Sequence, residues 1–290
     1  MINISDATKE LQGVYDNGVF SLDRWKEYIN REAPEIKDIC LNDMEESVSP
    51  QYSWKECFLP VLNAVFKKNK ETENVSKLFH SITDGLDEKI FKRFGKSVDA
   101  DIILYLGLCN GAGWVTEVDG KTTILLGIEK ILELKWDNLN DMNGLILHEL
   151  GHVYQNRFGV LYREFEDSGD KFLWQLFTEG IAMTFEQEIL EDSKYFHQDR
   201  NGWKNWCNQN IKKISSDFES DYRIMTGNNQ RYFGDWADYE KHSDVGYYLG
   251  TCFVRFVMEK DNFDNIICYD IDDVKRMWRN YLGTVKKAEC

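Results

Sequence analysis

Two histidines four residues apart, with a glutamate directly after the first, constrain this chain more than any other feature of its sequence. They lie in the segment His148-Glu149-Leu150-Gly151-His152. On a helix, side chains at positions i and i+4 lie one above the other, so both imidazoles can reach one ion at a Zn–N distance of about 2.0–2.1 Å. Glu149 then lies beside the open coordination position. The spacing predicts a zinc site on a helix.

The residues around this segment favour a buried helix. Apolar residues recur at helical spacing before, within and after it: Leu145, Ile146, Leu147, Leu150 and Val153. We expect Asn140 to cap the start of the helix, while Arg157 followed by Gly159 marks its end.

A catalytic zinc needs three protein ligands, and the third is expected downstream. Glu179 is the best candidate, because apolar residues at helical spacing around it predict a second buried helix that carries one inward carboxylate: Leu173, Leu176, Phe177, Ile181, Ala182, Phe185 and Ile189. A buried carboxylate is costly unless an ion or hydrogen bonds compensate it. Glu186 lies two turns further on, where it is expected to be a hydrogen-bonding partner of a ligating histidine.

Together, the HELGH segment and the later TEGIAMTFE segment that begins at Thr178 resemble the gluzincin metallopeptidases, in particular the aminopeptidase N family. Thr178 stands where that family has Asn. The stretch from His152 to Glu179 is longer than usual for the family, which predicts an insertion containing Leu161 to Lys171.

A further segment, Tyr247 to Arg255, resembles the family's segment that carries a catalytic tyrosine. The resemblance implies that Tyr247 donates a hydrogen bond to the tetrahedral oxyanion. Tyr248 is the neighbour that competes for this role, and the alternative for both is that they pack at the edge of the core.

Two buried strands are predicted before the zinc helix, Ile102 to Leu108 and Lys121 to Gly127, and we expect them to form a hairpin. Between them, Gly111-Ala112-Gly113 resembles the start of the aminopeptidases' substrate-binding strand, although such glycines also occur in plain turns. The family's next residues include a glutamate for the substrate's amino group. Trp114 and Val115 occupy those positions, so exopeptidase and endopeptidase activity stay open.

The mechanism implied is hydrolysis of an amide at one Zn²⁺ per chain, held by His148, His152 and Glu179. Zinc is expected to lower the pKa of its water toward about 7. Glu149 is the expected general base, which passes the proton to the leaving amine, and Tyr247 stabilises the oxyanion.

Composition excludes several function classes. A net charge of −15 argues against a nucleic-acid partner, because phosphates would be repelled. No apolar run is long enough to predict a membrane span, and the start of the chain lacks the pattern of a signal peptide, so we expect a cytoplasmic protein. Seven cysteines without a CxxC pair fit reduced thiols better than a disulfide framework.

These features predict an α+β, mostly helical fold, a gluzincin-like (thermolysin-type) catalytic domain with a small sheet before the zinc helix. We expect one compact unit in three parts: a helical region 1–96, the sheet and zinc helix in 97–160, and a helical part in 161–290 with the third ligand and the tyrosine.

The expected activity is that of a zinc peptidase acting on a peptide or protein substrate. Two alternatives stay open: a cytoplasmic metalloprotease regulator that cleaves one specific protein, and a non-catalytic zinc or peptide-binding protein. The sequence does not predict an oligomeric state.

Overall fold

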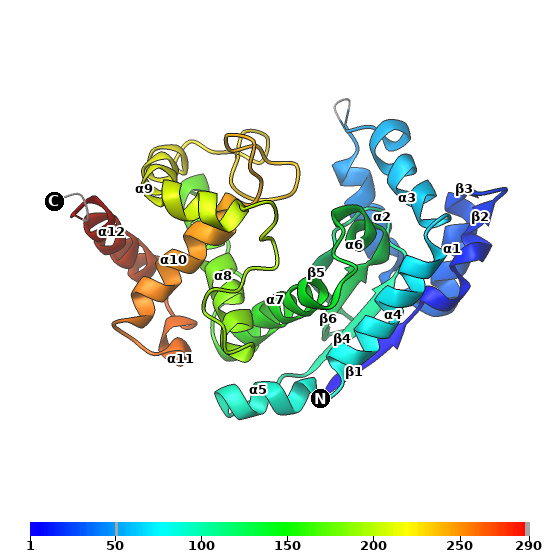
Figure 1. The fold of residues 1–290 in the computed structure, drawn as a ribbon, viewed down its shortest axis with the longest axis horizontal. Helices are drawn as coiled ribbons and strands as arrows, with labels where there is room; N and C mark the ends of the chain where they lie inside the picture. The colour runs from blue at the N-terminus through cyan, green and yellow to red at the C-terminus, as the bar shows by residue number, and fades with distance from the viewer. Residues whose placement is uncertain (50–51, 288–290) are drawn as a thin grey trace. The chain divides into compact units, whose positions relative to one another are not determined.

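The computed structural model describes residues 1–49 and 52–287, and it shows an α+β protein that is mostly helical (Figure 1). The chain divides into two compact units, Met1–Glu149 and Leu150–Cys290. The boundary falls within one helix, α7 (Leu139–Phe158), so each unit contains part of it.

The first unit contains a mixed sheet of four strands in the order β1-β4-β6-β5. β1 and β6 both pair with β4 in parallel, and β5 pairs with β6 in the antiparallel direction. This places β5 at one edge of the sheet. The strands are β1 (Ile2–Asp6), β4 (Ala100–Tyr105), β5 (Gly113–Val118) and β6 (Lys121–Gly127).

The sheet differs from the predicted hairpin in two ways. The two predicted strands correspond to β4 and β6, which lie side by side but run parallel. The hairpin is instead formed by β5 and β6, and its turn is at Asp119 and Gly120, both with positive φ. The sequence of β5 starts with glycine and lacks the alternation of apolar and polar residues that would have predicted this strand.

The described residues of region 1–96 form mainly helices, and the region also supplies β1 to the sheet and a short pair, β2 (Tyr15–Asp16) with β3 (Val19–Phe20). Ser21 caps the first long helix by accepting a hydrogen bond from the backbone of Arg24. The helices of the first unit are α1 (Leu22–Glu32), α2 (Lys37–Ser47), α3 (Leu59–Val65), α4 (Asn69–Thr83), α5 (Leu86–Phe94) and α6 (Ile128–Leu134). A 3-10 turn (Pro34–Ile36) lies between the first two of these helices and a π turn (Trp54–Phe58) between the second and the third.

Helix α1 is fixed to the ends of β1 and β4 by buried aromatic side chains. The Trp25 indole donates to the carbonyl of Leu106 at 2.8 Å, and the Tyr28 hydroxyl donates to the carbonyl of Ala7 at 3.0 Å. The same hydroxyl accepts from the backbone of Leu106 at 3.1 Å. The end of β1 and the end of β4, which leads into the loop before β5, are therefore held in place.

The second unit is helical among its described residues. Its core is aromatic, with Phe218 and Phe253 each edge-to-face with the buried Trp278. None of the described helices of either unit is long and apolar enough to span a membrane. The helices are α8 (Ser168–Ile189), α9 (Trp203–Asp221), α10 (Val245–Met258), α11 (Phe263–Ile266) and α12 (Ile271–Lys287).

Candidate metal centre

Helix α7 carries the two histidines and the glutamate of the HELGH segment, as predicted. Its apolar residues at positions 145–147, 150 and 153 are all buried. The helix begins two residues earlier than expected, because the cap is Asn138 and not Asn140: Asn138 Oδ1 accepts the N–H of Asp141 at 3.1 Å. Gly159 follows the last turn, as predicted.

Helix α8 carries Glu179, and the apolar stripe predicted around it is buried except for the last residue, Ile189, which is half-buried. The helix starts at Ser168, within the segment predicted as an insertion. Asp167 caps it by accepting from the backbone of Gly169 and Asp170 at 2.7 and 3.2 Å.

Glycine allows α7 and α8 to approach closely next to the second histidine. A Cβ atom at Gly151 would lie 2.8 Å from the Cα of Ala182, closer than such atoms pack. The glycine of the HELGH segment is therefore needed at this crossing, which lies one residue before His152 and three residues after Glu179.

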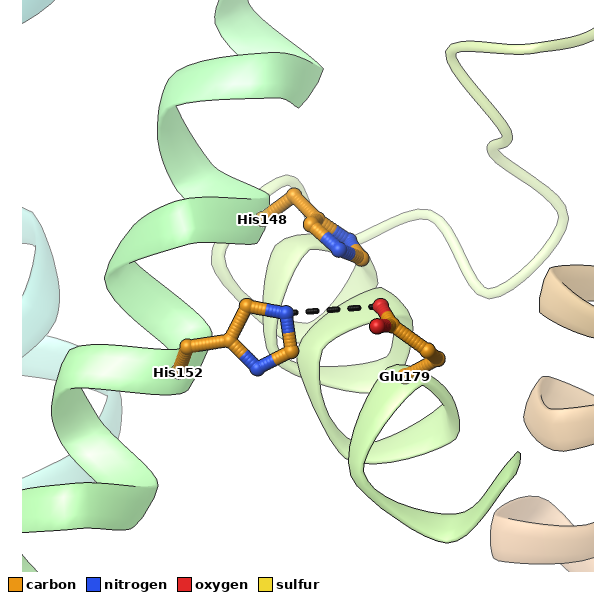
Figure 2. Close-up of side chains that lie close together, drawn as sticks. All are labelled: His148, His152 and Glu179. Atoms are coloured by element: carbon orange, nitrogen blue, oxygen red, sulfur yellow. Dashed lines mark ion pairs between the residues drawn. The ribbon is translucent and has the colours of Figure 1, made fainter. Parts of the chain in front are cut away.

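The three predicted ligands come together in the structure. His148 and His152 lie on successive turns of α7, and Figure 2 shows Glu179 of α8 facing their imidazole rings. One ligand atom from each residue lies within 4.8 Å of the others. His148 is buried, whereas His152 and Glu179 are half-buried.

The donor set and its spacing fit zinc. The Nε2 atom of His152 and the Oε2 atom of Glu179 are 3.3 Å apart. Two ligands at about 2.0–2.1 Å from a tetrahedral ion are separated by about 3.3 Å. A direct charge-assisted hydrogen bond would be shorter, at about 2.7–2.9 Å. Two imidazoles and one carboxylate are also a common ligand set of catalytic zinc.

Glu149 is buried and packs against the first residue of the edge strand β5. A Cβ atom at Gly113 would lie 2.8 Å from Oε1 of Glu149 and 2.9 Å from Cδ1 of Leu145. Only glycine leaves room for the carboxylate at this point of the strand. The structure therefore brings the candidate base and the edge of the sheet into contact within the first unit.

Of the three residues predicted to bind substrate, only Gly113 belongs to β5. Gly111 and Ala112 lie in the segment before it, where the carbonyl of Ala112 accepts the N–H of Gly127 at 3.1 Å. The prediction left a turn and a substrate strand open. In the structure, an irregular segment at Gly111 and Ala112 leads into a strand that starts at Gly113, and substrate binding by this strand stays a prediction.

Helix α10 carries the two tyrosines and crosses α8 beside Glu179. At the crossing, a Cβ atom on Gly180 would collide with the backbone carbonyl of Gly250. Tyr247 precedes Gly250 by three residues, so the two share one face of α10. The Tyr247 side chain is half-buried, and its ring contacts Phe233 edge-to-face at 6.0 Å.

Tyr248 points into a packed cluster. Its ring stacks on Phe196 at 5.1 Å and meets Trp203 edge-to-face at 6.0 Å. Its hydroxyl donates to Oδ1 of Asn208 at 3.1 Å. This packing favours Tyr247 as the residue that faces substrate, a role that stays a prediction.

Glu186, the predicted partner of a ligating histidine, is fully buried and lies beside a histidine that the sequence had not singled out. Its Oε2 atom is 2.9 Å from Nδ1 of His197. His197 lies in the loop before α9, but it is only 2% exposed. The role of Glu186 toward His148 or His152 stays a prediction.

Local signals could not have revealed this pair, because residues 190–202 form no regular element around His197. The one hint was the apolar Phe196 before it, which is also buried.

Comparisons with known proteins add no relative. A scan of the chain against models of protein families, a search of curated proteins and a search of solved structures each found no match. The geometry of the site is therefore the basis for the function proposed below.

Proposed function

We propose that this protein is a zinc-dependent peptidase with a gluzincin-like catalytic site. One observation carries the proposal: three side chains chosen from the sequence as zinc ligands, on two separate helices, present ligand atoms within 4.8 Å of one another. An HExxH motif that arose by chance would not be expected to lie beside a carboxylate from another helix. Here α8, which carries Glu179, starts ten residues after α7 ends.

His148, His152 and Glu179 would hold the ion, which leaves one tetrahedral position open. Zinc, when bound there, supplies a Lewis acid for the scissile carbonyl and a water that ionises near neutral pH. The half-burial of His152 and Glu179 gives an ion and a substrate access to the site.

Glu149 is the proposed general base. It directly follows His148 on α7, so its side chain leaves the helix next to the first proposed ligand. The carboxylate takes a proton from the attacking water and holds it until the amine leaves, when it returns the proton to the nitrogen. Burial against Gly113 and Leu145 fixes its position, which proton transfer over hydrogen-bond distance requires.

The edge strand β5 is the proposed substrate platform. An extended peptide can add to an open sheet edge by main-chain hydrogen bonds, with little dependence on its sequence. Gly113 starts this strand in contact with Glu149, so a peptide paired with β5 would run past the base.

Tyr247 is the proposed oxyanion donor. Its place on the α10 face that meets α8, next to the Glu179–Gly180 crossing, supports a position near the scissile carbonyl. A phenol that donates a hydrogen bond to the developing negative charge lowers the barrier without changing its own charge.

Cleavage of a peptide library tests the proposal. Zinc-loaded protein is expected to contain one zinc per chain by elemental analysis and to cleave fluorescence-quenched decapeptides. Glu149→Gln should keep its zinc and lose activity by on the order of 10²–10⁴, the usual contribution of a general base. Zinc bound by the wild type without cleavage of any peptide would instead favour a non-catalytic zinc protein.

The same library separates exopeptidase from endopeptidase activity. Trp114 and Val115 supply no carboxylate for a substrate's amino group, and the nearest acid on β5, Glu117, accepts a hydrogen bond from the Thr122 hydroxyl at 2.7 Å. Each decapeptide is offered with a free and with an acetylated amino terminus. Equal cleavage of the two forms assigns an endopeptidase, and cleavage of the free form alone assigns an aminopeptidase.

A further inference from the structure

A buried carboxylate lies outside the candidate metal centre, in the first turn of α6. Glu129 is only 1% exposed. Its Oε2 atom accepts the N–H of Gly107 at 2.8 Å, and its Oε1 atom accepts the N–H of Cys109 at 3.0 Å. Both donors belong to segment 106–112, which joins β4 to β5. One side chain thus fixes two peptide groups of this segment.

The carboxylate also packs closely on the segment. A Cβ atom at Gly107 would lie 2.5 Å from Oε1 of Glu129, so an alanine there would push the carboxylate out of its place. Cys109 adopts a left-handed φ of 62°, an uncommon conformation for a residue with a side chain. The carboxylate therefore holds a backbone path that the segment would not adopt by itself.

Asn110 anchors the same segment from its other side. Its side-chain amide donates to the carbonyl of Cys40 at 2.9 Å and to Oδ2 of Asp43 at 2.7 Å. Its Oδ1 atom accepts the N–H of Leu108 at 3.0 Å. Glu129 and Asn110 together make segment 106–112 a fixed support rather than a mobile turn.

This support leads directly into the contact between β5 and the candidate base. Gly113 follows Ala112, and the carboxylate of Glu149 packs where a side chain of Gly113 would be. A shift of the segment would move the start of β5 along or away from Glu149. The position of the sheet edge relative to the base therefore depends on how firmly Glu129 holds Gly107 and Cys109.

Burial of Glu129 removes water from its charged carboxylate, which is a desolvation cost that a neutral side chain would not have. Desolvation raises the pKa of this carboxyl to about 7, even though backbone N–H groups bond to it. A glutamine has almost the same shape and no charge to desolvate, but it has only one acceptor oxygen for two N–H donors. The ionised carboxylate has two acceptor oxygens, so it can accept both N–H groups at once.

We propose that Glu129 is a positioning residue that sets the start of β5 and thereby the affinity for a peptide paired with that edge. The proposal rests on the proposed function for its substrate, although the support of segment 106–112 can be tested without it. Glu129 touches neither the candidate ligands nor the reacting atoms, so it is expected to act on binding and not on the chemical step.

Hydrogen exchange tests the support directly. In Glu129→Gln, peptides covering 106–118 should exchange about tenfold faster, the size expected when one backbone hydrogen bond is lost. Exchange in β4, β6 and α7 should stay as in the wild type, with a similar melting temperature. The matched control is Glu133→Gln in the same helix, which removes only a carboxylate paired with Lys130 at 2.5 Å.

Gly107→Ala provides a second variant in case Glu129→Gln does not fold. It keeps the carboxylate but pushes it away from the segment, and it should loosen the same residues. Unchanged exchange over 106–118 in a folded variant overturns the proposal. Equal loss of protection throughout the first unit in both variants also overturns it, because Glu129 would then stabilise the fold in general.

Kinetics on the best-cleaved library peptide test the effect on substrate. Glu129→Gln should raise KM about tenfold and leave kcat within about twofold, the pattern of an interaction equal in ground and transition state. A fall in kcat at unchanged KM would contradict a positioning role in binding. If the wild type cleaves no peptide, the proposed function fails, whereas the exchange experiment still decides whether Glu129 holds β5.

Discussion

Two carboxylates on helix α8 each lie beside a histidine, but only one of the two pairs is open to solvent. Glu179 and His152 are 3.3 Å apart, and their side chains are 15% and 14% exposed. Seven residues later, Glu186 and His197 are 2.9 Å apart, and their side chains are 0% and 3% exposed. The same two residue types, with both carboxylates on one helix, thus occur in two different environments.

The two pairs differ in access and spacing rather than in residue type, which is the ground for proposing a metal site at one and a structural pair at the other. The buried pair has the length of a direct charge-assisted hydrogen bond and connects α8 to the loop before α9. The half-buried pair is longer, at the separation expected of two ligands of one ion. Three experiments separate these roles.

Loss of the buried histidine should have the largest effect. His197→Ala leaves Glu186 buried beside an empty space, and removal of one partner of a buried pair costs about 3–5 kcal/mol of stability. Denaturant unfolding of the metal-free protein measures this change. His242→Ala is the control, because this histidine of the same unit stacks on Trp206 closer to the surface. A loss below about 1 kcal/mol would mean that the pair does not support the fold.

Loss of the exposed carboxylate should spare the fold and weaken zinc binding. Glu179→Gln is expected to lower zinc affinity by on the order of a hundredfold or more, at least as much as the loss of a residue that only supports a ligand. Competition with a chromogenic chelator measures the affinity. Glu188→Gln is the control on the same helix, since its carboxylate pairs with Arg255. Zinc affinity equal to that of the wild type in Glu179→Gln would remove this residue from the ligand set.

The surroundings of the buried pair should also produce a smaller, pH-dependent effect. Burial raises the pKa of Asp244 from 3.8 to about 6, against the attraction of His197. Between about pH 4 and 6 the unfolded chain therefore releases this proton before the folded protein does, so stability falls as pH rises through this window. A shift of this size corresponds to a loss of at most about 3 kcal/mol.

Asp244→Asn should remove that component of the pH dependence. Asparagine tolerates the left-handed φ of 60° at this position and can still accept the N–H of Gly234. The difference between the wild-type and variant unfolding profiles isolates Asp244, because other carboxylates contribute equally to both. Parallel profiles from pH 4 to 7 would show that the carboxyl titrates normally.

The parts of the molecule that were predictable are those set by local sequence. The stripe around HELGH and the stripe around Glu179 each identified a helix, because the 3.6-residue period and the capping residues are local signals. The three candidate ligands that the structure brings together were predicted from the chemistry of zinc, which requires a third donor.

The parts that were missed depend on residues distant in sequence. The order of the strands is one: nothing within residues 100–127 indicates that β4 and β6 run parallel with β5 outside them. The pairing of Glu186 with His197 is another, since an irregular loop brings the histidine back to α8. The helix cap is Asn138 rather than Asn140. Helix ends are hard to predict from sequence, because several neighbouring residues can act as the cap.

The place of β1 in the sheet has a consequence for how the molecule is made. Residues 2–6 pair with residues 100–104, so a ribosome must synthesise about a hundred residues before the first strand finds its partner. Closing such a long loop is entropically unfavourable and slows the search for native contacts. The opening strand should therefore dock late, after β4, β5 and β6 have formed a nucleus from neighbouring segments.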